Sequence, residues 1–275
     1  MFINNKKING KTFIISGISS GIGKEIAREL IEKHGVKVYG IARNEQRILD
    51  FKQELKNKDN LLGYFLFDVS IEENWINLKK YFYEKDIKIN GIINCAGILP
   101  KFSTFENTSV KDFRNIIDVN FYSCIYACEH ILPILDKTTL QYVVNVASSA
   151  SLVTFSGISG YASSKSALKS FTLCLASELD KKVNVTCICP GTTDTGIFRN
   201  QNATEKESRL IKKICSSPQK IAKKSIKAII RGKKLKIVGY DAKLMNFFYK
   251  LAPNLTSKII SKILKKSGLS IFKQI

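Results

Sequence analysis

Short runs of β-branched and aromatic residues alternate along the chain with longer stretches whose apolar residues recur at helical spacing, such as Ile22, Ile26 and Leu30. The short runs have the length and composition of buried strands. They predict seven strands, at residues 12–16, 36–42, 62–68, 91–94, 142–147, 183–189 and 235–238. The intervening stretches predict helices between successive strands.

Strict alternation of strands and helices predicts an α/β fold with one parallel sheet. Right-handed crossovers then place helices on both faces, as in a Rossmann-type, doubly wound sheet. We expect residues 1–240 to form this single domain and residues 241–275 to form a C-terminal extension. Ligands of such sheets bind beyond the carboxyl ends of the strands, so residues that follow strands are the first candidates for function.

Composition restricts the classes of chemistry. The 275 residues are 44% hydrophobic, enough for a full core, and the seven cysteines include no C-x-x-C pair. We therefore expect a reducing environment and no disulfide framework. The two histidines, His34 and His130, lie far apart in sequence, and we assign no metal site.

No apolar run has the length of a signal peptide or a membrane span, so we expect a cytoplasmic protein. The net charge is +21, and residues 206–275 contribute +17 of it. From Leu255 onward, apolar residues occupy one half of a helical wheel and lysines the other, which predicts an amphipathic helix.

Two interpretations of this basic extension remain open. It packs on the protein's own core or on a partner subunit, beside the substrate cleft, or it attaches the protein peripherally to an anionic membrane surface. Nucleic acid is disfavoured as a partner, because the lysines are accompanied by aliphatic residues and no aromatic pattern suited to base stacking.

A glycine-rich turn follows the first predicted strand and precedes a helix. Gly17, Gly21 and Gly23 are separated by residues that include Ser19, Ser20 and Ile22. Glycine lets the backbone approach a pyrophosphate, and a helix N-terminus offers free N–H groups and a positive dipole end. The turn therefore predicts a nucleotide-binding site.

Arg43 follows the second strand, where no acidic residue is present to accept hydrogen bonds from the adenosine ribose. A guanidinium suits a 2′-phosphate. We therefore expect NADP to be preferred over NAD.

With these features the sequence resembles the short-chain dehydrogenase/reductase family from Lys11 to about Val238. The glycines match the family's G-x-x-x-G-x-G motif. Its N-N-A-G motif is similar to Asn94, Cys95, Ala96 and Gly97, with Cys95 in place of the second asparagine. The resemblance implies cofactor contacts from this segment, and from Asp68 and Val69 at the adenine.

The family's catalytic set is similar to Asn120, Ser148, Tyr161 and Lys165, with the Y-x-x-x-K spacing intact. Residues four apart share a helix face, and a nearby ammonium stabilises a phenolate, so Tyr161 is suited to proton transfer to or from a substrate oxygen. The resemblance implies that Lys165 also binds the nicotinamide ribose, that Ser148 polarises the substrate oxygen, and that Asn120 positions a relay water.

A later segment, Pro190, Gly191, Thr192 and Thr195, is similar to the family's P-G-x-x-x-T motif. The resemblance implies that it orients the nicotinamide carboxamide and that residues 196–218 form a lid over the substrate.

We therefore expect an enzyme that transfers a hydride between NADPH and a carbonyl or alcohol substrate, with a lipophilic substrate suggested by the extension. A 3-oxoacyl-carrier-protein reductase shares these motifs, and a non-catalytic binding protein that uses the basic tail is the alternative from another class. The fold also leads us to expect a homo-oligomer.

Overall fold

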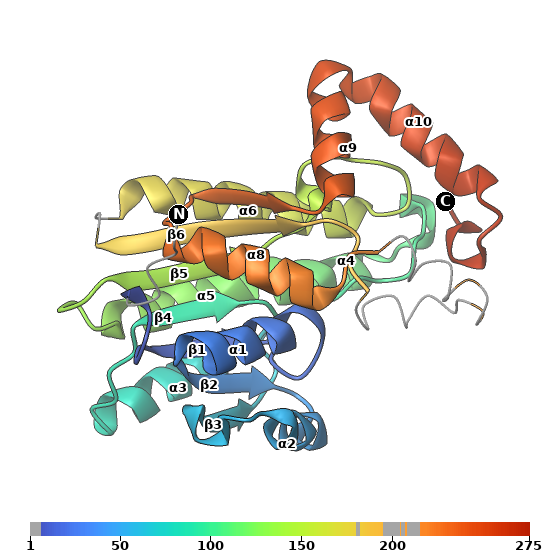
Figure 1. Cartoon of the computed structure of the whole chain (residues 1–275). Coiled ribbons are helices and arrows are strands. Elements are labelled where there is room, and N and C mark those ends of the chain that lie inside the picture. The colour runs from blue at the N-terminus through green and yellow to red at the C-terminus, as the bar shows by residue number, and fades with distance from the viewer. Residues whose placement is uncertain (1–6, 180–181, 195–203, 205–206, 208–214) are drawn as a thin grey trace.

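The computed structural model describes residues 7–179, 182–194, 204, 207 and 215–275. Seven strands form one parallel sheet in the order β3-β2-β1-β4-β5-β6-β7 (Figure 1). They are β1 (Thr12–Ser16), β2 (Lys37–Ala42), β3 (Leu61–Leu66), β4 (Gly91–Asn94), β5 (Gln141–Val146), β6 (Val183–Pro190) and β7 (Leu235–Val238). The predicted Rossmann-type sheet is confirmed, and small differences at strand ends reflect where the backbone ladder stops.

Helices cover both faces of the sheet (Figure 1). They are α1 (Gly21–His34), α2 (Glu45–Glu54), α3 (Glu72–Glu84), α4 (Val110–Ile117), α5 (Ser123–Ile131), α6 (Ser159–Glu178), α8 (Pro218–Ile230), α9 (Tyr240–Leu251) and α10 (Pro253–Lys266). One apolar cluster joins α1, α2 and α8 to the sheet. A second joins α3, α5 and α6 to the opposite face.

Burial on both faces explains why the sequences of the inner strands are almost continuously apolar. Every residue of β1, β4 and β5 is buried, since helices cover both of their faces. The edge strands β3 and β7 are partly exposed and include polar or small residues.

A buried hydrogen-bond chain links the two central strands to α6. Asn94 Nδ2 donates to Asn145 Oδ1 over 2.8 Å, and Asn145 Nδ2 donates to Thr172 Oγ1 over 2.9 Å. All three residues are at most 2% exposed. Because buried polar groups are costly without partners, this chain fixes the carboxyl ends of β4 and β5 relative to α6.

A π-helical turn, Asp118–Tyr122, lies between α4 and α5. Such turns widen the helix by one residue and redirect a side chain. Here the turn contains Asn120, which is completely buried.

After β7 the chain forms a helical hairpin, α9 and α10, that lies over the carboxyl edge of the sheet (Figure 1). Tyr249 Oη lies 2.9 Å from Thr154 Oγ1, and Ser257 Oγ donates to the Thr154 carbonyl over 2.7 Å. Beyond α10, the ring of Phe272 packs against Phe102 at a centroid distance of 4.8 Å. The hairpin therefore contacts the loop that follows β5. The predicted domain boundary after residue 240 stays a prediction.

In the described part of the chain, no helix combines the length and the apolar character needed to cross a membrane.

The Asn94–Asn145–Thr172 chain makes a prediction about stability. Asn145→Ala leaves the buried Asn94 amide nitrogen without its partner and removes the hydrogen bond that Thr172 Oγ1 accepts, while Thr172 still donates to the Leu168 carbonyl. We therefore expect a loss of about 2 to 4 kcal/mol in the free energy of unfolding. Urea denaturation measures this. The control, Ser177→Ala, removes an exposed hydroxyl and is expected to change stability by less than about 0.5 kcal/mol. Equal stability of the two variants would contradict a structural role for Asn145.

Candidate active site

The glycine-rich turn folds tightly between β1 and α1. Gly17 and Gly21 adopt positive φ angles of 72° and 56°, which side-chain-bearing residues rarely adopt. A Cβ on Gly17 would lie 2.8 Å from the Ala96 nitrogen, and one on Gly23 would meet the Gly17 carbonyl oxygen. Glycine is therefore required for the turn to pack against the β4 loop and against α1.

The N-terminus of α1 is open toward an anion. The side chain of its N-cap residue, Ser20, makes no capping hydrogen bond, and the first turn contains no acidic residue. The free N–H groups and the positive dipole end are thus available to a phosphate. Together with the space left by the glycines, this fits the pyrophosphate of a dinucleotide.

Ser16, which the sequence analysis did not single out, anchors the neighbouring loop. Its Oγ accepts hydrogen bonds from the Cys95 and Ala96 backbone nitrogens at 3.1 and 3.2 Å. The loop 95–97 is thereby held beside the glycine turn.

Arg43 projects from the carboxyl end of β2, and its side chain is 69% exposed. Its Nη1 lies 3.7 Å from Asp68 Oδ2, a long contact that leaves most of the guanidinium donors available. Burial opposes ionisation of Asp68, but hydrogen bonds from Ser70 and the charge of Arg43 bring its pKa below the ordinary value. Val69 is buried, and its carbonyl accepts the Trp75 indole N–H.

Tyr161 and Lys165 lie one turn apart on α6, and both line the cleft. Lys165 is only 4% exposed, and its Nζ donates to the Val146 carbonyl at the end of β5 over 3.0 Å. An ammonium has three donors, so two remain after this bond for other partners. The Tyr161 side chain is partly exposed, as a group that meets a substrate must be.

Ser148 follows β5 and lines the same cleft. Its Oγ accepts a hydrogen bond from the Ala150 nitrogen over 3.1 Å, which orients the hydroxyl and leaves its own proton to donate.

The Asn120 side chain does not line the cleft; it holds the loop beneath it. Its Oδ1 accepts from the Ile98 nitrogen over 2.8 Å, and its Nδ2 donates to the Ile98 carbonyl and to Ser164 Oγ. A Cβ on Gly97 would lie 2.9 Å from Asn120 Oδ1 and 3.3 Å from Lys165 Nζ. Asn120 and Lys165 thus approach the same backbone segment.

One cleft of about 450 Å³ connects these groups at the carboxyl edge of the sheet. It brings together most of the predicted site: Gly17, Ser20, Gly21, Ile22, Gly23, Arg43, Ala96, Gly97, Ser148, Tyr161, Lys165, Pro190, Gly191 and Thr192. Ser19, Asp68, Val69, Asn94 and Asn120 are described but do not line it. Thr195 and most of the expected lid, 196–218, lie outside the described residues.

The far side of the cleft has an apolar wall. It comprises Leu99, Phe102, Phe155, Ile158, Met245, Ile260, Leu264 and Phe272. Four of these belong to the C-terminal extension. Their helical periodicity was visible in the sequence, but their contact with the cleft depends on the path of the hairpin.

Asp241, at the start of α9, was also missed. Its carboxylate accepts a hydrogen bond from the Thr192 nitrogen over 2.6 Å. The same carboxylate occupies the space that a side chain at Gly191 would need. An acidic residue of the extension therefore fixes the loop that follows β6.

Cys95, which replaces the second asparagine of the family motif, is not suited to act as a nucleophile. Burial raises the pKa of its thiol to about 12, so the thiol is neutral near pH 7. It fills space beside Gly23 rather than offering a nucleophile.

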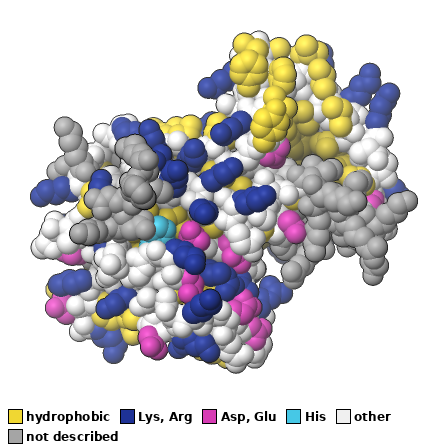
Figure 2. Space-filling view, in the orientation of Figure 1, with side chains coloured by type: hydrophobic (Ala, Val, Ile, Leu, Met, Phe, Trp, Pro, Cys, Tyr) yellow, Lys and Arg dark blue, Asp and Glu magenta, His cyan; other side chains and the backbone are white. Residues whose placement is uncertain are grey.

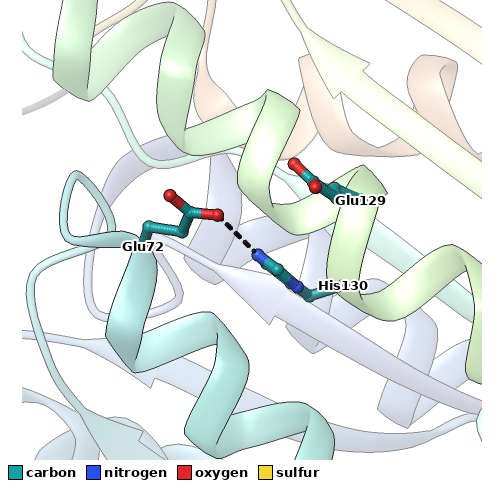
Figure 3. A group of neighbouring side chains, drawn as sticks. All are labelled: Glu72, Glu129 and His130. Atoms are coloured by element: carbon teal, nitrogen blue, oxygen red, sulfur yellow. Dashed lines mark hydrogen bonds and ion pairs between the residues drawn. The ribbon is translucent and has the colours of Figure 1, made fainter.

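A group of three ligand-type side chains, Glu72, Glu129 and His130, lies on α3 and α5, away from the cleft (Figure 3). His130 Nε2 is 3.1 Å from Glu72 Oε1, and both glutamates are exposed. This hydrogen bond accounts for the approach of Glu72 and His130, and exposed carboxylates such as Glu129 commonly lie nearby without a metal.

The chain is similar to known oxidoreductases over most of its length. It shares 30% identity over 246 residues with a 3-ketodihydrosphingosine reductase from Bos taurus, covering 86% of this chain and 74% of that one. It shares 32% over 202 residues with a benzil reductase ((S)-benzoin forming) from Saccharomyces cerevisiae, covering 71% and 76%. The structure of levodione reductase matches with a TM-score of 0.76 and 20% identity, over 86% of this chain and 98% of that one, which supports the fold.

A family model described as short chain dehydrogenase matches residues 11–206. That span contains the glycine turn, the β4 loop and all four candidate catalytic residues. The chain therefore belongs to the short-chain dehydrogenase/reductase family of oxidoreductases.

Proposed function

We propose that this protein is an NADP-dependent reductase that interconverts a lipophilic ketone and its alcohol. The observation that supports this most strongly is a single cleft that contains the glycine turn, Arg43, Ser148, Tyr161 and Lys165. A dinucleotide on the turn and an oxygen-bearing substrate against the apolar wall would share that cleft. When bound, the nicotinamide supplies or accepts the hydride.

The proton is assigned to the Tyr161 hydroxyl. In reduction the hydroxyl gives its proton to the carbonyl oxygen, and in oxidation the phenolate takes it back. Lys165 is suited to stabilise the phenolate and to bind the ribose, because its contact with Val146 uses one donor of three. The Ser148 proton can be donated to the substrate oxygen, since the Ser148 oxygen already accepts from Ala150.

Asn120 is assigned a positioning role. Its side chain is fully used by Ile98 and Ser164, so a relay water would be bound by its backbone carbonyl rather than by its amide. The sequence-based expectation that Asn120 positions a relay water stays a prediction.

The substrate is inferred from the apolar wall. Leu99, Phe102 and Phe155 from the catalytic domain and Met245 and Ile260 from the hairpin offer mainly hydrocarbon contacts. Two relatives are named 3-ketodihydrosphingosine reductase and benzil reductase, and both names denote reduction of a ketone.

A substrate panel tests the proposal. Ketones of increasing chain length, together with a 3-oxoacyl thioester, are assayed with NADPH and with NADH. Turnover of long-chain ketones with NADPH supports the proposal, and preference for the thioester would favour the 3-oxoacyl-carrier-protein reductase. The absence of turnover across the panel would favour a non-catalytic binding protein.

Tyr161→Phe tests the proton donor. The substitution keeps the ring but removes the acidic proton, so kcat is expected to fall at least about a hundredfold while the Kd for NADPH changes only a few-fold. Steady-state kinetics and fluorescence titration measure these two quantities. The control is Tyr240→Phe, at a side chain that is 79% exposed. A variant that kept a tenth of wild-type kcat would exclude Tyr161 as the acid.

Arg43→Ala tests the cofactor preference. The charge-assisted contact with a 2′-phosphate is worth about 1.5 to 3 kcal/mol, so the preference for NADPH over NADH should fall roughly ten- to a hundredfold, mainly through KM. Arg47→Ala, at an exposed arginine one turn further on, should leave the ratio unchanged. The assignment is wrong if the two variants show the same ratio as the wild type.

Asp241→Ala tests the loop after β6. Loss of the acceptor leaves the Thr192 nitrogen unpaired, so the KM for NADPH should rise about five- to fiftyfold. Asp241→Asn, which retains an oxygen acceptor, should have a smaller effect. The positioning role fails if the alanine variant binds NADPH as well as the asparagine variant does.

A further inference from the structure

The two helices of the hairpin expose a broad apolar surface. It consists of six residues that are each between 48% and 69% exposed: Phe247, Phe248, Leu251, Leu255, Ile259 and Ile263. We call this surface the apolar face. Figure 2 shows hydrophobic side chains gathered over the hairpin, with basic side chains beside them. Soluble proteins rarely leave so many large apolar side chains together in water.

Other side chains of the hairpin contact the catalytic domain. Met245, Ile260 and Leu264, beside the apolar face on the same two helices, line the substrate cleft instead. Polar contacts from Tyr249 and Ser257 to Thr154 tie the hairpin to the catalytic domain. The two helices therefore have two apolar surfaces, and the outer one is left for another partner.

Lysines accompany the apolar face along α10. A groove of about 650 Å³ runs between the loop 154–156 and this helix, and Lys258, Lys262, Lys265 and Lys266 line it with hydroxyl-bearing residues such as Ser261. No acidic side chain lines the groove among the described residues. All four lysines are exposed, and the groove suits the phosphate of a lipid headgroup.

The charges of the hairpin favour an anionic membrane over a second copy of the chain as its partner. Within residues 240–275 the sole acidic residue is Asp241, and its carboxylate is occupied by Thr192. A second copy of the chain docked symmetrically on this face would bring two sets of lysines together. An anionic bilayer instead offers phosphates to the lysines and hydrocarbon to the apolar face.

We propose that the α9–α10 hairpin docks the protein on an anionic membrane surface, with the apolar face inserted among the lipids and the lysine groove on their headgroups. The cleft wall and the docking surface are then two sides of the same hairpin. A substrate dissolved in the bilayer would reach Tyr161 without a long passage through water, a consequence that rests on the proposed function.

Co-sedimentation of the full chain with vesicles tests the docking. Vesicles of phosphatidylcholine alone are compared with vesicles of phosphatidylcholine and phosphatidylserine. The wild type is expected to sediment with the anionic vesicles and at least about tenfold less with the neutral ones. Wild-type protein that stays in the supernatant with anionic vesicles at low salt overturns the proposal.

Two pairs of substitutions locate the surface. Phe247→Ser with Phe248→Ser, and Lys258→Glu with Lys262→Glu, should each lower partitioning onto anionic vesicles about tenfold or more. The matched controls are Ile76→Ser with Tyr83→Ser on α3, which are 40% and 78% exposed, and Lys52→Glu with Lys58→Glu near α2. Equal losses in the controls would mean that general charge or hydrophobicity, not the hairpin, binds the lipid.

Two further measurements separate the alternatives. If the phenylalanine pair converts a dimer to a monomer in analytical ultracentrifugation without changing lipid binding, the face is a subunit interface and the proposal is wrong. Turnover of a short, water-soluble ketone with NADPH should be unchanged in both hairpin variants, whereas turnover of a vesicle-borne long-chain ketone should fall. If the wild type reduces no ketone at all, the proposed function is wrong, whereas the docking proposal is still judged by the sedimentation result.

Discussion

Parallel pairing of the seven strands is the constraint on which the site depends, because it brings every strand's carboxyl end to one edge. Ser16, Asn94, Val146 and Pro190 end four strands that are adjacent in the sheet but far apart in sequence. The glycine turn, the β4 loop, Ser148 and the loop after β6 all start there. The chemistry is therefore assembled by topology, and each loop contributes one part of the cleft.

A layer of buried polar contacts below the cleft keeps those parts in place. Ser16 holds the β4 loop, Asn120 holds Ile98, and Val146 holds the Lys165 ammonium. Each of these groups would be costly if unpaired, so alternative positions of the loops are disfavoured. The π-helical turn serves the same purpose, since it aims the Asn120 amide inward instead of along a regular helical face. Hydrogen bonds among buried polar groups therefore hold the cleft in one arrangement before any ligand binds.

The C-terminal extension completes the cleft from outside the sheet. Asp241 fixes the loop after β6, while Met245 and Ile260 add hydrocarbon to the substrate side. The same helices keep an apolar outer surface and a lysine groove. An element that both lines the cleft and contacts lipid would couple substrate supply to location. This gives a physical reason for an extension of 35 residues that contains seven lysines and one acidic residue.

Local pattern was sufficient to predict the strands, the glycine turn and the Y-x-x-x-K pair, because strand burial, tight turns and helix faces depend on residues close in sequence. The contacts of Asn94 and Asn120 required the tertiary structure: Asn94 Nδ2 donates to a residue 51 positions away, and the Asn120 amide bonds residues 22 and 44 positions away. The same is true of Asp241, whose partner Thr192 is 49 residues away. Amphipathic periodicity located the extension's helices, but only their docking decided which apolar side meets the cleft, since a helical wheel shows the faces of a helix and not the surfaces that will cover them.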